Sequence, residues 1–159
     1  MFLKPDYNLK NIFAIDLEEL KTKGITALLF DLDSTIMASK SGAYTEETTK
    51  WLEKAKRDFF VAVISNNNNP DYIEKVRKIS DFPMLFDAKK PKAEEGLKFL
   101  KQHSIEPSCA VMVGDRPLTD IWFGKRLGCK TILVDSITAD REKKIVRFVR
   151  KLERCCIKN

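Results

Sequence analysis

The sequence has few of the residues that hold zinc or form disulfide crosslinks. It contains a single histidine, His103, and its four cysteines, Cys109, Cys129, Cys155 and Cys156, show no C-x-x-C spacing. This spacing argues against a zinc site. We therefore expect free thiols, which are typical of a protein in a reducing compartment.

Long apolar runs are also missing. No stretch of about 18 apolar residues is present, so no membrane-spanning helix is predicted. The first residues, MFLKPDYNLKNIF, lack a basic segment followed by an apolar core, and we expect no secretory signal. With 43% hydrophobic and 33% charged residues, the composition predicts one soluble domain over residues 1–159, located in the cytoplasm.

Most of the positive charge lies at the C-terminal end. Residues 140–159 contribute +5 of the net charge of +6, and residues 139–158 are predicted to form a basic amphipathic helix. Its apolar side would carry Ile145, Phe148, Val149, Leu152 and Cys156, and its basic side Arg147, Arg150, Lys151, Arg154 and Lys158. We expect the apolar side to pack on the domain while the basic side stays in solvent. The alternative is attraction of the basic side to anionic lipid, and both can hold at once.

Short apolar runs alternate with amphipathic stretches along the chain. Strands are predicted at 25–30, 60–64, 110–113 and 131–134, with a weaker one at 83–86. Helices are predicted at 45–57, 70–80, 93–103, 118–127 and 139–156. This alternation predicts an α/β fold, a Rossmann-like three-layer sandwich with a central parallel sheet.

Polar residues follow the predicted strands where each one ends. Asp31 and Asp33 follow the first strand, Ser65 and Asn66 the second, a lysine-rich segment (FDAKKPK) the weaker strand, and GDRPLTD the strand at 110–113. The carboxyl ends of parallel strands share one edge of the sheet, where ligands bind. We therefore expect one site formed by acids, a hydroxyl and a lysine.

These residue types point to phosphate chemistry with a hard cation. Several carboxylates without a cysteine cluster suit Mg²⁺, which often takes a phosphate oxygen as a further ligand. An aspartate can attack phosphorus and form an aspartyl-phosphate. Asp33 lies two residues after Asp31 and points the same way in an extended chain, so it can protonate the leaving alcohol and then activate water.

The segments DLDST, ISNN, KKPK and GDRPLTD, in this order, resemble the four motifs of the haloacid dehalogenase superfamily of phosphatases. The resemblance implies that Asp31 is the nucleophile and Asp33 the general acid/base. It further implies that Ser65, the backbone N–H of Asn66, and Lys90 bind phosphate. Lys90 is selected among three lysines because it directly precedes a proline.

The same resemblance implies a set of metal ligands. These would be Asp31, Asp33 through its backbone carbonyl, and Asp115, with Asp120 acting less directly or through water. The implied cofactor is Mg²⁺.

A longer set of segments is similar to the YqeG-type subfamily, which includes mitochondrial phosphatidylglycerophosphate phosphatases. The set includes the opening LKPDY, the SNNN run, AKKPK and GDRPLTDIWFGKRLGCKTILV, and it covers nearly the whole chain. The gaps at 36–59 and 66–89 are too short for an inserted cap domain, so the resemblance implies a capless fold. A bare site is compatible with a lipid headgroup, and with peripheral contact at the inner face of a membrane.

Three functions remain open from the sequence. The leading hypothesis is Mg²⁺-dependent hydrolysis of phosphatidylglycerophosphate to phosphatidylglycerol. The second keeps the mechanism but takes a soluble phosphomonoester, such as a nucleotide or sugar phosphate, or a nucleic-acid end. The third is a catalytically silent interaction module, which would need no acid/base at Asp33. We expect an anionic phospholipid as the partner and no nucleic acid.

Overall fold

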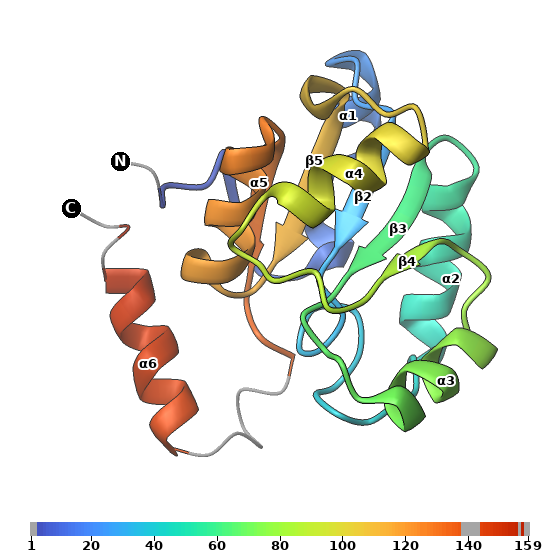
Figure 1. Cartoon of the computed structure of the whole chain (residues 1–159). Helices are drawn as coiled ribbons and strands as arrows, with labels where there is room; N and C mark the ends of the chain where they lie inside the picture. The colour runs from blue at the N-terminus through green and yellow to red at the C-terminus, as the bar shows by residue number, and fades with distance from the viewer. Residues whose placement is uncertain (1–2, 138–143, 156, 158–159) are drawn as a thin grey trace.

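A six-stranded parallel sheet forms the centre of the computed structural model, which describes residues 3–137, 144–155 and 157 (Figure 1). The strands lie in the order β1–β6–β5–β2–β3–β4. Their bounds are Tyr7–Leu9 (β1), Ala27–Phe30 (β2), Phe60–Ile64 (β3), Met84–Leu85 (β4), Ala110–Gly114 (β5) and Lys130–Val134 (β6). The predicted parallel sheet is confirmed.

The helices lie between these strands in the chain. Their bounds are Leu17–Thr22 (α1), Glu46–Lys56 (α2), Pro70–Lys78 (α3), Glu94–Gln102 (α4), Trp122–Leu127 (α5) and Lys144–Cys155 (α6). Short 3₁₀ turns occur at Ile12–Ala14 (η1) and Pro107–Cys109 (η2), and a π-helical turn, Pro117–Ile121 (η3), leads into α5.

Alternate residues of the central strands supply two cores, one on each face of the sheet. Leu28 and Phe30 belong to a cluster that α1, α2 and α3 cover with Leu20, Leu52 and Val76. Ala27 and Leu29 belong to a second cluster, covered by α4 and α5 through side chains such as Phe99 and Phe123. Helices on both faces make the three layers expected from the sequence (Figure 1).

Local sequence signals explain where several helices begin and end. The side chain of Thr45 accepts a hydrogen bond from the Thr48 amide at the start of α2. Asn69 caps α3 in the same way, and Pro70 occupies the first helical position. Gly128 ends α5 in the left-handed conformation, with φ of 87°.

Strand pairing brings the ends of β2, β3 and β5 to one edge. Phe30 at the end of β2 lies opposite Val63 on β3 and Val113 on β5. The Asp31 amide continues the ladder by donating to the Val113 carbonyl at 2.9 Å. The polar residues that follow these three strands are therefore neighbours.

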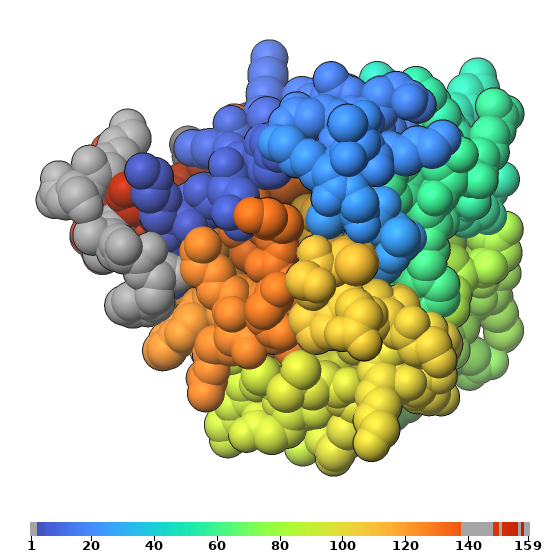
Figure 2. Space-filling model, turned by 90° about the horizontal axis from the view of Figure 1, so that it is seen from above, coloured from blue at the N-terminus to red at the C-terminus, as the bar shows by residue number. Residues whose placement is uncertain are grey.

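The N-terminal elements β1 and α1 were missed by the sequence analysis, because each is short and lacks a long apolar run. Strand β1 is held at the edge of the sheet by long-range contacts. Asp6 accepts hydrogen bonds from the amide and the hydroxyl of Thr131, both at 2.9 Å. Figure 2 shows the N-terminal segment alongside the orange region that contains β6.

The predicted C-terminal helix is present as α6, but its expected orientation is wrong. Phe148, Val149 and Leu152 are exposed, whereas Glu153 is buried and Arg154 is half-buried. Ion pairs to the body of the protein hold the polar side of the helix inward. The predicted extensions at 139–143, 156 and 158 lie outside the described residues.

Candidate active site

A pocket of about 280 Å³ opens at the carboxyl edge of the sheet. All seven residues that the sequence analysis selected line it: Asp31, Asp33, Ser65, Asn66, Lys90, Asp115 and Asp120. They come from the ends of β2, β3 and β5, the loop after β4, and η3. The tertiary structure thus brings together residues spread over 90 positions of the chain.

Lys90 lies at the centre of the polar contacts. Its Nζ donates to Oδ1 of Asp31 and to Oδ1 of Asp120, each at 2.7 Å. The Lys90 side chain is 2% exposed, and those of Asp31 and Asp120 are 15% and 1% exposed. A buried ion pair of this kind persists only with close geometry, because both charges have left water.

Burial shifts the ionisation of this cluster. Burial and the charge of Asp120 raise the pKa of the Asp31 carboxyl to about 7, against the opposing effect of Lys90. Burial disfavours the charged form of Lys90, but Asp120 and Asp31 outweigh it and raise the pKa of the ammonium group. Lys90 therefore stays cationic over the physiological pH range.

Three carboxylates form a candidate cation site. Ligand oxygens of Asp31, Asp115 and Asp120 lie within 4.8 Å of one another. Gly114 makes this possible, since a Cβ there would approach the Cβ of Asp120 to 2.3 Å. A donor set made only of hard oxygens fits Mg²⁺ and does not fit the softer metals that prefer sulfur or imidazole.

The side chain of Asp33 has a different set of partners. Its Oδ1 accepts from the Tyr72 hydroxyl at 2.6 Å and from the Lys40 amide at 2.9 Å. Burial and the hydrogen bond to Asp33 raise the pKa of Tyr72, so the phenol stays protonated and donates. Asp33 lines the same pocket as Asp31 but takes no part in the carboxylate trio. Sequence reasoning missed Tyr72, since nothing in its spacing marks it as a partner of Asp33.

The Asn66 side chain has a role that the sequence did not reveal. Its Oδ1 accepts from the Lys90 amide at 2.7 Å, and its Nδ2 donates to the Lys90 carbonyl at 3.0 Å. This double hydrogen bond ties the loop after β4 to the end of β3. The amide side chain therefore positions the backbone from which the lysine reaches Asp31 and Asp120.

Helix α6 contacts the loop that carries Asp115. The Arg116 guanidinium donates to Oε1 of the buried Glu153 at 2.9 Å. Arg154 donates to the carbonyls of Val134 and Asp115 and pairs with Asp135 at 3.0 Å. The position of Glu153 on the inner side of α6 could not be foreseen, because it interrupts the apolar pattern.

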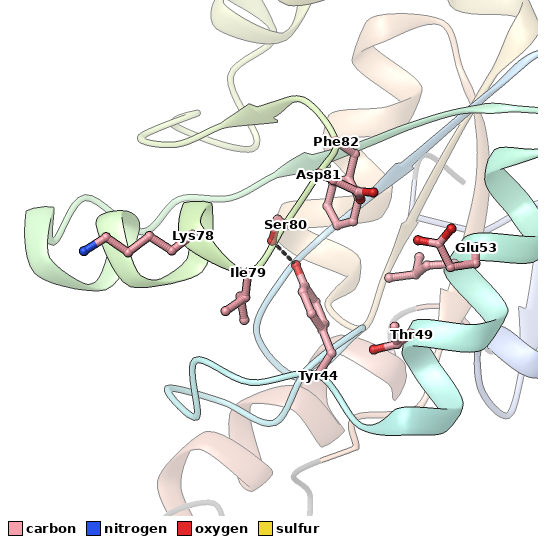
Figure 3. A pocket seen from close by; sticks show the side chains of 9 residues that line it. Tyr44, Thr49, Glu53, Lys78, Ile79, Ser80, Asp81 and Phe82 are labelled. Atoms are coloured by element: carbon pink, nitrogen blue, oxygen red, sulfur yellow. Dashed lines mark hydrogen bonds between the residues drawn. The ribbon is translucent and has the colours of Figure 1, made fainter.

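A second pocket, of about 320 Å³, lies beside α2 and the segment after α3 (Figure 3). The Tyr44 and Ser80 hydroxyls are hydrogen-bonded there at 2.8 Å. Its two carboxylates, Glu53 and Asp81, both pair with Lys56. This pocket is slightly larger than the first one, yet it offers no comparable group of acids. The chemistry of the lining, not the volume, identifies the site.

Comparison with known proteins agrees with this geometry. A sequence model of a family described as "Mitochondrial PGP phosphatase" matches residues 1–138. "Probable phosphatase YqeG" of Bacillus subtilis (strain 168) is 31% identical over 153 residues, which is 96% of this chain and 88% of that protein. "Phosphatidylglycerophosphate phosphatase 1, chloroplastic/mitochondrial" of Arabidopsis thaliana is 33% identical over 175 residues, 99% of this chain. The chain spans 48% of the length of that plant protein.

Solved structures support the fold. A protein described as uncharacterized, from Listeria monocytogenes serotype 4b, matches with a TM-score of 0.60 and 20% identity, over 69% of this chain and 78% of that one. The 2-haloacid dehalogenase from Pseudomonas syringae pv. Tomato DC3000 matches with a TM-score of 0.50 and 24% identity, over 64% of this chain and 44% of that one. At these identities, the likeness concerns the arrangement of strands and helices.

The Asn66→Ala variant tests the hydrogen bonds that hold the lysine loop. It removes both contacts to Lys90 but keeps the backbone amide of residue 66, so we expect kcat for p-nitrophenyl phosphate to fall at least about tenfold. Thermal unfolding should change little, because Asn66 is exposed. The matched control is Asn68→Ala in the same asparagine run, which should retain activity. Equal activity of the two variants would contradict this role.

The raised pKa of Asp31 predicts a pH-dependent effect on stability. Its pKa is higher in the folded than in the unfolded chain, so its charge destabilises the metal-free protein as pH rises from about 4 to about 7. We expect Asp31→Asn to raise the free energy of unfolding near pH 8 by on the order of 1–3 kcal/mol, and to change it little near pH 4. Urea unfolding in EDTA measures this, with the exposed Glu18→Gln as control. A loss of stability near pH 8 would overturn the assignment.

Proposed function

The chain belongs to the mitochondrial PGP phosphatase family of the haloacid dehalogenase superfamily, and on that premise we propose that it dephosphorylates phosphatidylglycerophosphate through an aspartyl-phosphate. As a member of this family it is a phosphoric monoester hydrolase. The observation that carries the proposed mechanism is the meeting of Asp31, Lys90, Asp115 and Asp120 in one pocket.

Asp31 is the proposed nucleophile. One of its carboxylate oxygens attacks phosphorus, and the bond between phosphorus and the ester oxygen breaks. The Lys90 ammonium, 2.7 Å from Oδ1 of Asp31, favours the ionised carboxylate that this step needs. The same cation offsets the negative charge of the incoming phosphate.

Asp33 is the proposed acid and base. It donates a proton to the departing alcohol oxygen in the first step. In the second step it takes a proton from water, whose oxygen attacks the phosphorus of the aspartyl-phosphate. The bond to Asp31 then breaks, and inorganic phosphate leaves.

Ser65, Asn66 and Lys90 form the proposed phosphate-binding group. Ser65 is buried at the end of β3 and lines the pocket, as does Asn66 directly after it. We assign contacts with phosphate oxygens to the Ser65 hydroxyl, the Asn66 amide and the Lys90 ammonium. Their positions on different strand ends allow contacts with different oxygens of one phosphoryl group.

Asp31, Asp115 and Asp120, with the backbone carbonyl of Asp33, are the proposed holders of Mg²⁺. The hard-oxygen trio supports this assignment. A bound Mg²⁺ supplies positive charge against the phosphoryl oxygens. It would also lower the pKa of Asp31, since a cation favours the ionised carboxylate.

The proposed lipid substrate rests on the family and on the open site. Between β2 and β3 the chain forms α2 and connecting loops, and between β3 and β4 it forms α3, so no cap domain is inserted. None of the described helices is long and apolar enough to cross a membrane. The proposed place of action is therefore a membrane surface, which the enzyme meets from outside the bilayer. A soluble phosphomonoester is the second candidate, because an open pocket accepts small esters as well.

Phosphate release from phosphatidylglycerophosphate in mixed micelles with Mg²⁺ tests the proposal. We expect release well above that of Asp31→Asn, which should lose at least about 10³-fold because the variant lacks the nucleophile. EDTA should stop turnover and added Mg²⁺ should restore it. Turnover of soluble esters without lipid turnover would remove the lipid substrate. Retained activity in Asp31→Asn would remove the nucleophile.

A further inference from the structure

Helix α6 presents apolar side chains to solvent on its outer side. The Phe148 side chain is 61% exposed, Leu152 51% and Val149 38%. Phe148, Leu152 and the exposed Cys155 recur at helical spacing, so they lie on one face of the helix. Figure 1 shows α6 on the opposite side of the fold from α2 and α3.

The polar side of α6 holds this orientation. Glu153 is buried and pairs with Arg116, while Arg154 pairs with Asp135 and donates to main-chain carbonyls at the end of β6. These contacts determine the rotation of the helix about its axis. The outward apolar face is therefore a consequence of ionic docking.

The charge of the helix identifies what would cover this face. Lys151 is exposed between Phe148 and Leu152, and residues 140–159 carry most of the protein's positive charge. A helix with an apolar face and flanking basic residues is typical of segments that lie in the surface of an anionic bilayer. A partner surface made only of apolar groups would leave the lysine without a counter-charge.

We propose that α6 seats the protein on an anionic lipid bilayer, with Phe148 and Leu152 inserted among the lipids and Lys151 at the level of the phosphates. This rests on the proposed function, whose substrate is an anionic lipid. Because α6 contacts Arg116 in the site loop, a helix seated in this way holds the phosphate pocket close to the lipid surface. The open site then needs no cap to select its substrate.

The double variant Phe148→Gln/Leu152→Gln tests this surface by sedimentation with vesicles. Wild-type protein should bind vesicles of phosphatidylcholine with about one third phosphatidylglycerol, and pure phosphatidylcholine vesicles more weakly. The variant should bind the anionic vesicles at least about tenfold more weakly, because two inserted apolar side chains are lost. Its kcat/KM for p-nitrophenyl phosphate should be unchanged. Its turnover of phosphatidylglycerophosphate in bilayers should fall.

The matched control is Ile79→Gln/Leu97→Gln, which removes two exposed apolar side chains elsewhere. It should bind vesicles like the wild type. Equal vesicle binding by all three proteins would overturn the proposal, as would a wild-type dimer in light scattering that the α6 variant abolishes. Loss of all phosphatase activity in the wild type would instead overturn the proposed function.

A separate observation concerns Tyr72. Its hydroxyl and the Lys40 amide both donate to the same oxygen of Asp33, Oδ1, at 2.6 and 2.9 Å. The asparagine run places this tyrosine on α3. The Asn67 amide donates to Oγ of Ser65, the Asn69 amide to Oδ1 of Asn67, and the Tyr72 amide to Oδ1 of Asn69. The chain thus links the phosphate-binding serine to the tyrosine through consecutive turns.

We infer that Tyr72 is a positioning residue for the acid/base Asp33. With two donors on Oδ1, the remaining oxygen, Oδ2, is the one that carries the proton to the leaving alcohol. The tyrosine holds the carboxyl in one orientation while the proton moves. This inference rests on the proposed role of Asp33 and goes beyond it.

The Tyr72→Phe variant separates this role from a structural one. Alkyl phosphates need a proton at the departing oxygen, whereas p-nitrophenolate leaves without one. We therefore expect kcat/KM to fall at least about tenfold for an alkyl phosphate and much less for p-nitrophenyl phosphate.

Tyr44→Phe, which removes a hydroxyl paired with Ser80 in the second pocket, is the control and should affect neither ester. Equal losses on both esters in Tyr72→Phe, or no loss on either, would overturn the inference. An inactive wild type would count against the proposed function instead.

Discussion

The buried ammonium group of Lys90 is the interaction on which this site depends. It lies between the carboxylates of Asp31 and Asp120, at 2.7 Å from each. Without it, two acids would face each other away from water, and an uncompensated buried charge costs several kcal/mol. Asn66 holds the backbone of the lysine, and the missing side chain of Gly114 leaves space for Asp120. The loop after β4, the end of β3 and the turn after β5 are thus all adjusted to one cation.

The same preference for paired charges explains the position of α6. Arg116 follows directly after a buried acid of the site, and its partner Glu153 lies on the inner side of the helix. Burial of this ion pair turns Phe148 outward, against the apolar pattern of the helix. Electrostatics in the site loop therefore reaches the outer surface of the protein through a single helix, and it links the phosphate pocket to the surface that we propose meets the lipid.

Much of the fold and site could be predicted from short-range patterns. The strands at 25–30, 60–64 and 131–134 are visible as apolar runs, and the acids that follow β2 and β5 mark the carboxyl edge. Strand β1 escaped prediction because its pairing with β6 relies on Asp6 and Thr131, which are 125 positions apart. The contact between Tyr72 and Asp33 escaped for the same reason, since it joins α3 to a turn 39 residues earlier.

The sequence by itself determined the layer architecture and the chemical groups of the site. Helix and strand periodicity is local, and residues at the ends of parallel strands must meet at one edge. Only the tertiary structure decided which atoms these groups hold. It assigned Oδ1 of Asp33 to Tyr72, used the Asn66 side chain to position Lys90, and turned the apolar face of α6 outward. Those outcomes depend on the balance of burial and charge pairing among residues distant in the chain, which no local pattern contains.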